Sequence, residues 1–230
     1  MNAVVFYWLA IPVCQSPATQ ADRLLEGCSY LRGLSETSVG GTRVDDYNCG
    51  LVVPVTEFAS EPLFQYPWAV PEKFYTLFVV DPDVPNYAVG EFFLHMLKSN
   101  IPGSELKFKN NGTIKGDEYQ PYFPPMPPAG SGLHRYISVL YQQADGNFRP
   151  DVPLERTKFR LGDWLVDKNL CGPVAGTQFL TQNAQDQLLF RYSSSSSSFS
   201  SAGIGRPLLD IVGLPHRPPV ASVESGLDKL

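Results

Sequence analysis

The chain has 230 residues, a formal net charge of -5 at pH 7 and 43% hydrophobic residues. This length suits one domain with tails, and the hydrophobic fraction is that of a globular protein. The acidic balance excludes a general nucleic-acid binder, because no basic field attracts phosphate backbones. An anionic ligand must therefore be bound locally, in a pocket. The 21 Pro, 14 Phe and 11 Tyr residues favour strands and loops over helices.

The N-terminal residues 1–21 are predicted to be a signal peptide. The segment from Ala3 to Cys14 is nearly all apolar, and the first charged residue is Asp22. This run is shorter than the ~20 apolar residues of a membrane-spanning helix, and it matches the ~7–15 residues of a secretory apolar region. The alternative is an apolar N-terminal strand or a disordered leader. The signal peptide predicts a secreted, extracellular protein.

Two further features concern the same compartment. Asn111 begins an Asn-Gly-Thr acceptor for N-glycosylation in a polar stretch of residues 107–118. If Cys14 is removed with the leader, three cysteines remain, and one disulfide plus one free thiol is the simplest arrangement. Cys28 and Cys49 are the preferred pair because they share a short segment, while Cys171 lies far away. The alternative is three buried thiols.

Three segments in the middle of the chain are predicted to be long strands buried on at least one face. They are dense in aromatic and β-branched residues and end at turn-forming residues. A shorter strand is predicted at Leu51–Val55, where Pro54 indicates a strand end or a sheet edge. The long strands are predicted at Lys73–Val80, Glu91–Lys98 and His134–Tyr141.

Helices are predicted only toward the C-terminus. Leu161, Trp164 and Leu165 are spaced to share one helical face within Glu155–Lys168. A shorter helix is predicted at Gln182–Leu188. The folded domain is expected to span residues 22–192. Residues 193–230 begin with six consecutive serines and are rich in Ser, Pro and Gly, which predicts a disordered tail.

Asp81, Asp83, His95 and His134 lie on or next to the three long strands. Such residues can form a metal site with two histidines and a carboxylate, a general base for hydrolysis, or an anion pocket. In the pocket, imidazoles and backbone N–H groups donate to a phosphate while the aspartates orient the imidazoles. The alternative is that each histidine is a core residue and each aspartate a turn former. No nucleotide-binding or zinc-binding motif is present, so no cofactor is predicted.

The order of several short motifs is similar to that of the phosphatidylethanolamine-binding proteins. The segment 81–85 reads Asp-Pro-Asp-Val-Pro, and residues 127–136 read Pro-Pro-Ala-Gly-Ser-Gly-Leu-His-Arg-Tyr. A third block follows at Pro173–Thr177. The resemblance covers about Leu51 to Phe179, and residues 176–183 resemble those of the secreted animal members.

The resemblance implies a single domain that is mainly β with C-terminal helices, built as an antiparallel β-sandwich with a small pocket at one end. It also implies a cis peptide bond between Val84 and Pro85. The chain differs from many members at Leu94, where they carry a further histidine, and at Met126, where some carry glycine. Loss of the histidine is expected to weaken anion binding. The residues implied to form the pocket are Asp81, Asp83, Pro85, His95, Pro127, Pro128, His134 and Tyr136.

The predicted function is that of a secreted, non-enzymatic binding protein for phospholipid head groups or phosphate-like ligands. The alternative is a serine protease inhibitor or a signalling-interaction protein that acts through its surface. A more remote alternative is a metal-dependent enzyme that uses His95, His134 and Asp81 or Asp83. Neither nucleic-acid binding nor stable membrane insertion is expected, because the chain offers no basic patch and no basic amphipathic helix.

Overall fold

The computed structural model describes residues 24–107, 112–151, 154–166 and 168–186. The predicted signal peptide, the glycosylation site at Asn111 and the predicted tail lie outside the described residues. None of the helices in the described part of the chain is long and apolar enough to cross a membrane.

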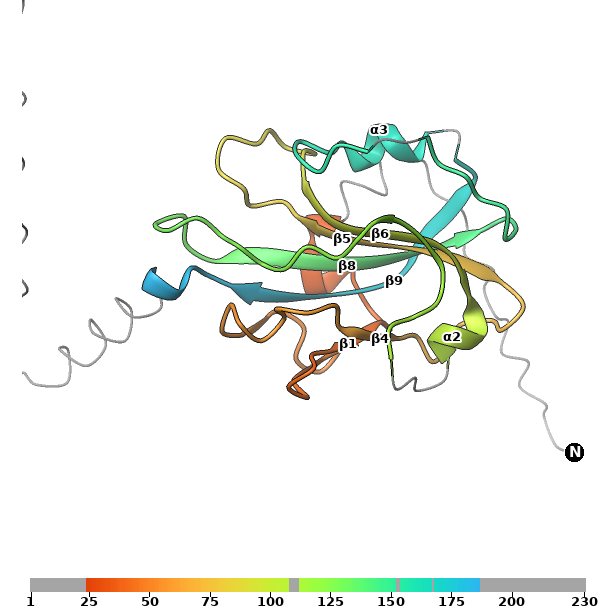
Figure 1. Cartoon of the computed structure of the whole chain (residues 1–230), viewed down its shortest axis with the longest axis horizontal. Coiled ribbons are helices and arrows are strands. Elements are labelled where there is room, and N and C mark those ends of the chain that lie inside the picture. The colour runs from red at the N-terminus through yellow and green to blue at the C-terminus, as the bar shows by residue number, and fades with distance from the viewer. Residues whose placement is uncertain (1–23, 108–111, 152–153, 167, 187–230) are drawn as a thin grey trace, which may run out of the picture.

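The described residues form two sheets and a few short helices (Figure 1). A small sheet has the strand order β2-β1-β4, and the central sheet has the order β3-β9-β8-β5-β6-β7. The small sheet consists of β1 (Ser35–Thr37), β2 (Arg43–Val44) and β4 (Leu63–Gln65). The central sheet consists of β3 (Leu51–Val52), β5 (Phe74–Asp81), β6 (Phe93–Pro102), β7 (Asp117–Gln120), β8 (His134–Gln143) and β9 (Leu170–Thr181). The helices are η1 (Gly27–Ser29), α2 (Gly103–Lys107) and α3 (Leu161–Leu165).

The two faces of the central sheet carry separate cores, because side chains alternate along a strand. On β5, Phe78 and Val80 pack into the cluster that also holds Leu161 and Leu165 of α3. Leu77 of the same strand lies in the opposite cluster, with residues of the small sheet such as Phe64. Figure 1 accordingly shows α3 on one side of the long strands, with β1 and β4 on the other.

The long strands expected near residues 73–80, 91–98 and 134–141 are present as β5, β6 and β8. The central sheet is mixed, however, because β3 pairs in parallel with β9 while the other neighbours are antiparallel. The description as an antiparallel sandwich is therefore wrong in part. The coarser prediction of a mainly β protein with few helices is confirmed.

The predicted helix at residues 155–168 is reduced to the five residues of α3. Lys158 has a positive φ of 51°, and Phe159 exchanges two backbone hydrogen bonds with Phe92 beside β6. These residues are thus held outside any helix by a tertiary contact. The predicted second helix lies partly outside the described residues, although residues 184–186 are helical.

Cys28 and Cys49 form a disulfide, the pair that the sequence favoured. Cys171 is also disulfide-bonded, so the expected free thiol is wrong. The expected cis peptide at Val84–Pro85 is wrong as well. Among the described residues the cis peptide bond is instead Gly172–Pro173 in β9.

Candidate ligand-binding pocket

Three neighbouring strands bring the predicted polar residues to one end of the central sheet. Asp81 is the last residue of β5, while His95 lies near the start of β6 and His134 is the first residue of β8. Because β5 runs antiparallel to both neighbours, its end meets their beginnings. Strand order and register therefore assemble residues that are up to 53 positions apart in the chain.

Asp81 and His134 form a fully buried pair at this end of the sheet. His134 Nδ1 lies 2.7 Å from Asp81 Oδ2, and Asp81 Oδ1 accepts the backbone N–H of Asp83 at 2.7 Å. On the other side of the imidazole ring, Nε2 lies 2.8 Å from Ser131 Oγ. The two side chains of the pair are only 2% and 1% exposed, so they form a rigid floor rather than a mobile surface.

Counting protons gives the charge of this pair. The Ser131 hydroxyl donates its single proton to the Pro128 carbonyl oxygen at 2.6 Å. His134 must therefore donate the proton in its contact with Ser131, and a second proton is held between Nδ1 and the Asp81 carboxyl group. With two protons shared, the Asp81–His134 pair has no net charge.

The Ser131–His134–Asp81 contacts have the connectivity of a hydrolase triad, but the proton order is the opposite of what catalysis needs. A nucleophilic serine gives its proton to Nε2 of the histidine, which must be an acceptor. Here Ser131 already donates to Pro128, and Nε2 is a donor. The arrangement stabilises the loop before β8 and does not activate the serine.

His95 is held in one orientation and is neutral at physiological pH. Its Nδ1 lies 2.7 Å from the carbonyl oxygen of Phe123, which fixes the proton on Nδ1. Burial lowers the pKa of His95 to about 4, although the Phe123 carbonyl and Asp81 act in the opposite direction. At neutral pH the remaining ring nitrogen, Nε2, is therefore a hydrogen-bond acceptor.

Asp83 is used to anchor β8 and does not face the pocket. Its carboxylate accepts two hydrogen bonds from the Arg135 side chain, at 2.8 and 2.7 Å, and a third from the Arg135 backbone N–H. Partial burial raises the pKa of Asp83, but these bonds and the charge of Arg135 hold it below the usual value. Such bidentate arginine–carboxylate pairs fix geometry as well as charge.

A cavity of about 220 Å3 lies over this floor. Phe93, His95 and Tyr136 stand side by side along it, with ring centroids 4.8 and 4.9 Å apart. Its lining is mostly aromatic, aliphatic and proline residues. The lining residues are Asp81, Val84, Tyr87, Phe93, His95, Phe123, Met126, Pro127, Pro128 and Tyr136.

The predicted site residues divide into two groups. Asp81, His95, Pro127, Pro128 and Tyr136 line the cavity. The other three do not: His134 is the buried part of the floor that the cavity does not reach, Asp83 is paired with Arg135, and Pro85 is exposed.

Leu94, the position at which many members carry a further histidine, lies outside the pocket. Its side chain is fully buried in the core on the α3 side of the sheet, whereas His95 points to the cavity. At this position of β6 a histidine would lie on the other face, so its absence removes no donor from the pocket.

Five lining residues were not in the predicted set. The sequence singled out Met126 only as a difference from other family members. The other four are Val84, Tyr87, Phe93 and Phe123. Phe93 lies two residues before His95 on the same strand and therefore on the same face, which the strand period alone could have indicated. Phe123 donates its backbone N–H to the His95 carbonyl oxygen, a long-range contact with no sequence signal.

The metal-site alternative gains no support from this geometry. The described part of the chain contains no group of three His, Cys, Asp or Glu side chains placed to hold a metal ion. In addition, both ring nitrogens of His134 are used in hydrogen bonds within the protein.

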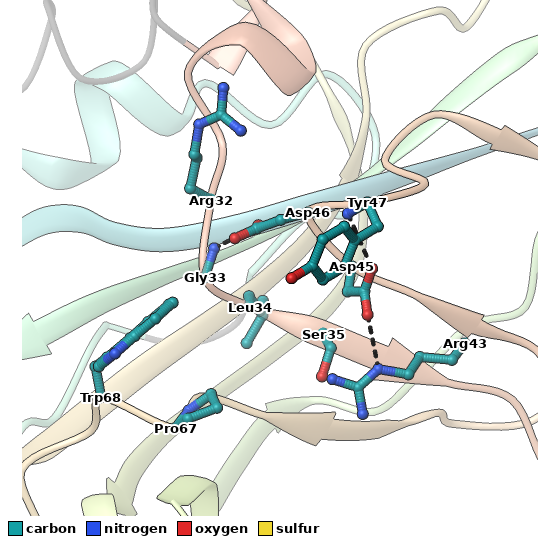
Figure 2. A pocket seen from close by; sticks show the side chains of 10 residues that line it. All are labelled: Arg32, Gly33, Leu34, Ser35, Arg43, Asp45, Asp46, Tyr47, Pro67 and Trp68. Carbon is teal, nitrogen blue, oxygen red and sulfur yellow. Dashed lines mark hydrogen bonds and ion pairs between the residues drawn. The ribbon is translucent and has the colours of Figure 1, made fainter.

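A larger hollow of about 470 Å3 lies elsewhere, beside the small sheet (Figure 2). It contains two exposed aromatic residues, Trp68 and Tyr47, and the pair of Arg43 and Asp45, whose Nε and Oδ2 atoms are 2.9 Å apart. Figure 2 shows Trp68 and Tyr47 on opposite sides of Gly33. None of the predicted site residues lines this hollow.

The fold and the site together define a mainly β protein with a small, preorganised pocket at one end of its central sheet. The family model described as phosphatidylethanolamine-binding protein matches residues 47–179, which is more than half of the chain. The chain therefore belongs to the phosphatidylethanolamine-binding protein family.

Two relatives are similar in sequence. Odorant-binding protein A5 of Drosophila melanogaster is 35% identical over 102 residues, which cover 44% of this chain and 45% of that protein. The 26 kDa secreted antigen of Toxocara canis is 29% identical over 175 residues, which cover 68% of this chain and 64% of that protein. The chain thus spans about half to two thirds of the length of the curated relatives it matches.

Two solved structures share the fold. A carboxypeptidase Y inhibitor, solved with its cognate proteinase, has a TM-score of 0.54 and 21% identity and covers 76% of this chain and 98% of its own. The phosphatidylethanolamine-binding protein from Plasmodium vivax has a TM-score of 0.50 and 19% identity, with 74% and 98% covered. At these identities the likeness concerns the fold alone.

Proposed function

We propose that this protein is a secreted, non-enzymatic binding protein that holds the head group of a phospholipid, or a phosphate-like ligand, in the pocket at the ends of β5, β6 and β8. The observation that carries the proposal is the cavity over the Asp81–His134 floor, whose polar atoms are already oriented by hydrogen bonds. A preorganised site binds without an ordering cost. A relative named as a secreted antigen supports the extracellular location.

The charge of the pocket determines which head group fits best. The Asp81–His134 pair is neutral as a unit, and His95 is neutral at pH 7. Arg135, the nearest cation on β8, is committed to Asp83. Arg156 stacks on Phe123 and donates its N–H groups to backbone carbonyl oxygens, and it does not line the cavity. A doubly charged anion therefore meets no cation among the lining residues, whereas a zwitterionic head group brings its own counter-charge, and its ammonium group can contact the aromatic rings.

Calorimetric titration of the full chain at pH 7 tests the proposal, with phosphoethanolamine as ligand and inorganic phosphate and ethanolamine as its two halves. We expect one saturable site for phosphoethanolamine and weaker binding of each half. The substitution Val84→Trp fills the cavity and should abolish binding. Val89→Trp, in the same loop but 84% exposed and outside the lining, is the matched control.

Equal binding by wild type and Val84→Trp would refute this site. Tighter binding of inorganic phosphate than of phosphoethanolamine would refute the preference for a zwitterion and leave a simple anion pocket.

A second candidate function is interaction with a protein partner such as a serine protease. The hollow of Figure 2 favours it, because exposed Trp68 and Tyr47 offer large rigid aromatic surfaces of the kind enriched at interfaces. If this surface binds a serine protease, the wild-type chain will inhibit the protease in an activity assay. The Trp68→Ala variant will not inhibit it, whereas the Val84→Trp variant will.

A further inference from the structure

The segment of residues 123–128, here called the proline strap, separates the ligand pocket from a second hollow of about 380 Å3. The second hollow carries no ionisable side chain in its lining. Its other walls come from the turn after β3 and from the residues that follow β9. The lining residues outside the strap are Val55, Thr56, Ala59, Asn183 and Ala184.

The two hollows meet at the strap. Met126 and Pro127 line both of them, and Met126 is 67% exposed at the rim between them. Methionine is flexible and apolar, so it can cover a hydrocarbon that passes from one hollow to the other.

The strap is a fixed wall. Phe123 donates its backbone N–H to the His95 carbonyl oxygen at 2.8 Å, and Asn183 Nδ2 donates to the Pro127 carbonyl oxygen at 3.0 Å. These contacts tie the strap to β6 at one end and to the residues after β9 at the other. The groove along the strap is therefore a permanent feature of the fold.

The chemistry of the strap selects its occupant. Proline has no backbone N–H, so residues 124–128 carry a single such donor, at Met126. An extended peptide would find at most this one backbone donor along these residues, whereas a hydrocarbon chain needs none.

We infer that the natural ligand is an amphiphile whose head group occupies the pocket and whose hydrocarbon chain crosses Met126 into the groove beside the strap. This inference rests on the proposed function and concerns the hydrocarbon chain, the part of the ligand that lies outside the pocket. At about 220 Å3 the pocket is smaller than the ~300–1,000 Å3 typical of small-molecule sites, so it holds only a fragment of such a molecule.

Chain length is the variable that tests this inference. The full chain is titrated with phosphoethanolamine and with lysophosphatidylethanolamines of six, eight and ten acyl carbons, all below their micelle concentrations. A fully buried methylene increases affinity about fourfold, and in an open groove we expect at least about twofold for each.

Two substitutions at one exposed groove residue distinguish the effect of burying the hydrocarbon chain from an electrostatic effect on the ligand. Ala59→Glu and Ala59→Lys both place a charged group in the groove, and both should remove the gain per methylene while leaving phosphoethanolamine affinity nearly unchanged. A purely electrostatic effect would instead act in opposite directions in the two variants. Val39→Glu, 79% exposed and outside both linings, is the matched control.

The outcomes are distinguishable. Binding of phosphoethanolamine with no gain in affinity along the series, or with the same gain in both Ala59 variants as in wild type, overturns the inference alone. Absence of phosphoethanolamine binding overturns the proposed function and this inference with it.

Discussion

Asp81 is the residue on which the geometry of the pocket floor depends. One of its carboxylate oxygens accepts the Asp83 N–H and the other bonds to His134, both at 2.7 Å and both buried. Asparagine could keep both contacts, because its oxygen can accept the Asp83 N–H while its NH2 group donates to His134 Nδ1. Alanine has no polar atom at this position, so the floor loses both hydrogen bonds when Asp81 is replaced by Ala.

We expect Asp81→Ala to lower the free energy of unfolding by at least about 1–3 kcal/mol, the cost of an unsatisfied buried polar group, because the partners on Asp83 and His134 both lose their hydrogen bond. Urea unfolding measures the change. Asp151→Ala is the control, because Asp151 is 98% exposed and its ion pair with Lys168 is long, at 3.4 Å. If both substitutions have the same small effect, Asp81 does not hold the floor together.

Ser131 is predicted to be unreactive despite its contact with His134. Because its proton is donated to Pro128, a fluorophosphonate probe should not label the full chain. Labelling that disappears in Ser131→Ala would contradict both the proton order described above and the non-enzymatic function.

At the residue scale, the sequence located part of the pocket lining, including Pro127 and Pro128, but missed Val84, Tyr87, Phe93 and Phe123. Asp81 and Tyr136 lie in short motifs and His95 lies in a predicted strand, and their strands converge, so their meeting was predictable. Asp83 and His134 belong to the same motifs, yet neither faces the cavity. The Asp83 side chain contacts Arg135, and the His134 side chain contacts Asp81. Motif membership predicts which residues meet, while burial decides which of them face a ligand.

At the scale of elements, Glu36 links the two sheets. It lies on β1 of the small sheet, and its Oε2 accepts a hydrogen bond at 2.8 Å from Ser138 on β8 of the central sheet. Burial raises the pKa of Glu36 to about 8, although the Ser138 bond acts in the opposite direction. The folded protein therefore keeps a proton on Glu36 at pH values where the unfolded chain has lost it.

This difference predicts how stability depends on pH. Between the usual glutamate pKa of 4.5 and about 8, unfolding releases the Glu36 proton, so rising pH favours the unfolded state by up to about 1.4 kcal/mol per pH unit. Glu36→Gln cannot release a proton and should lack this decline. The difference in unfolding free energy between Glu36→Gln and wild type should grow from pH 5 to pH 8.

Comparing Glu36→Gln with wild type at each pH cancels the contributions that other titratable groups make to the unfolding free energy. One of these is His95, whose lowered pKa makes stability rise between about pH 4 and 6.5. A difference that stays constant from pH 5 to pH 8 would mean that Glu36 is ionised in the folded protein.

The elements that were predicted are those whose own sequence determines them. Strands β5, β6 and β8 have long apolar and β-branched runs that are buried on both faces. Strand β9 was missed because it contains Gly172, Pro173 and Gly176, which usually interrupt strands. It forms because β8 provides nine paired positions along its length. Tertiary pairing therefore outweighs local preference in β9. The same holds at Phe159, where two backbone hydrogen bonds to Phe92 keep the residues before α3 out of a helix.

For the whole molecule, the Cys28–Cys49 disulfide fastens the N-terminal residues to the central sheet. It joins η1 to the residue before Gly50, whose N–H donates to the Gln178 carbonyl oxygen of β9. The two cysteines are 21 positions apart. Closing a loop of this length stabilises a folded chain by about 3 kcal/mol.

The double substitution Cys28→Ser/Cys49→Ser should therefore reduce the unfolding free energy by about 3 kcal/mol, measured by guanidinium unfolding. Substitution is a sharper test than a reducing agent, because Cys171 is also disulfide-bonded. Unchanged stability would show that the N-terminal segment contributes little to the folded state.

The central claim is that a small zwitterionic head group binds in the pocket beneath the proline strap. The most direct test follows the His95 ring and the Trp68 indole signals by NMR while phosphoethanolamine is added to the full chain. We predict saturable shifts of the His95 signals with no change at Trp68, which lies in the separate hollow of Figure 2. Shifts at Trp68 alone, or at neither residue, would contradict the account.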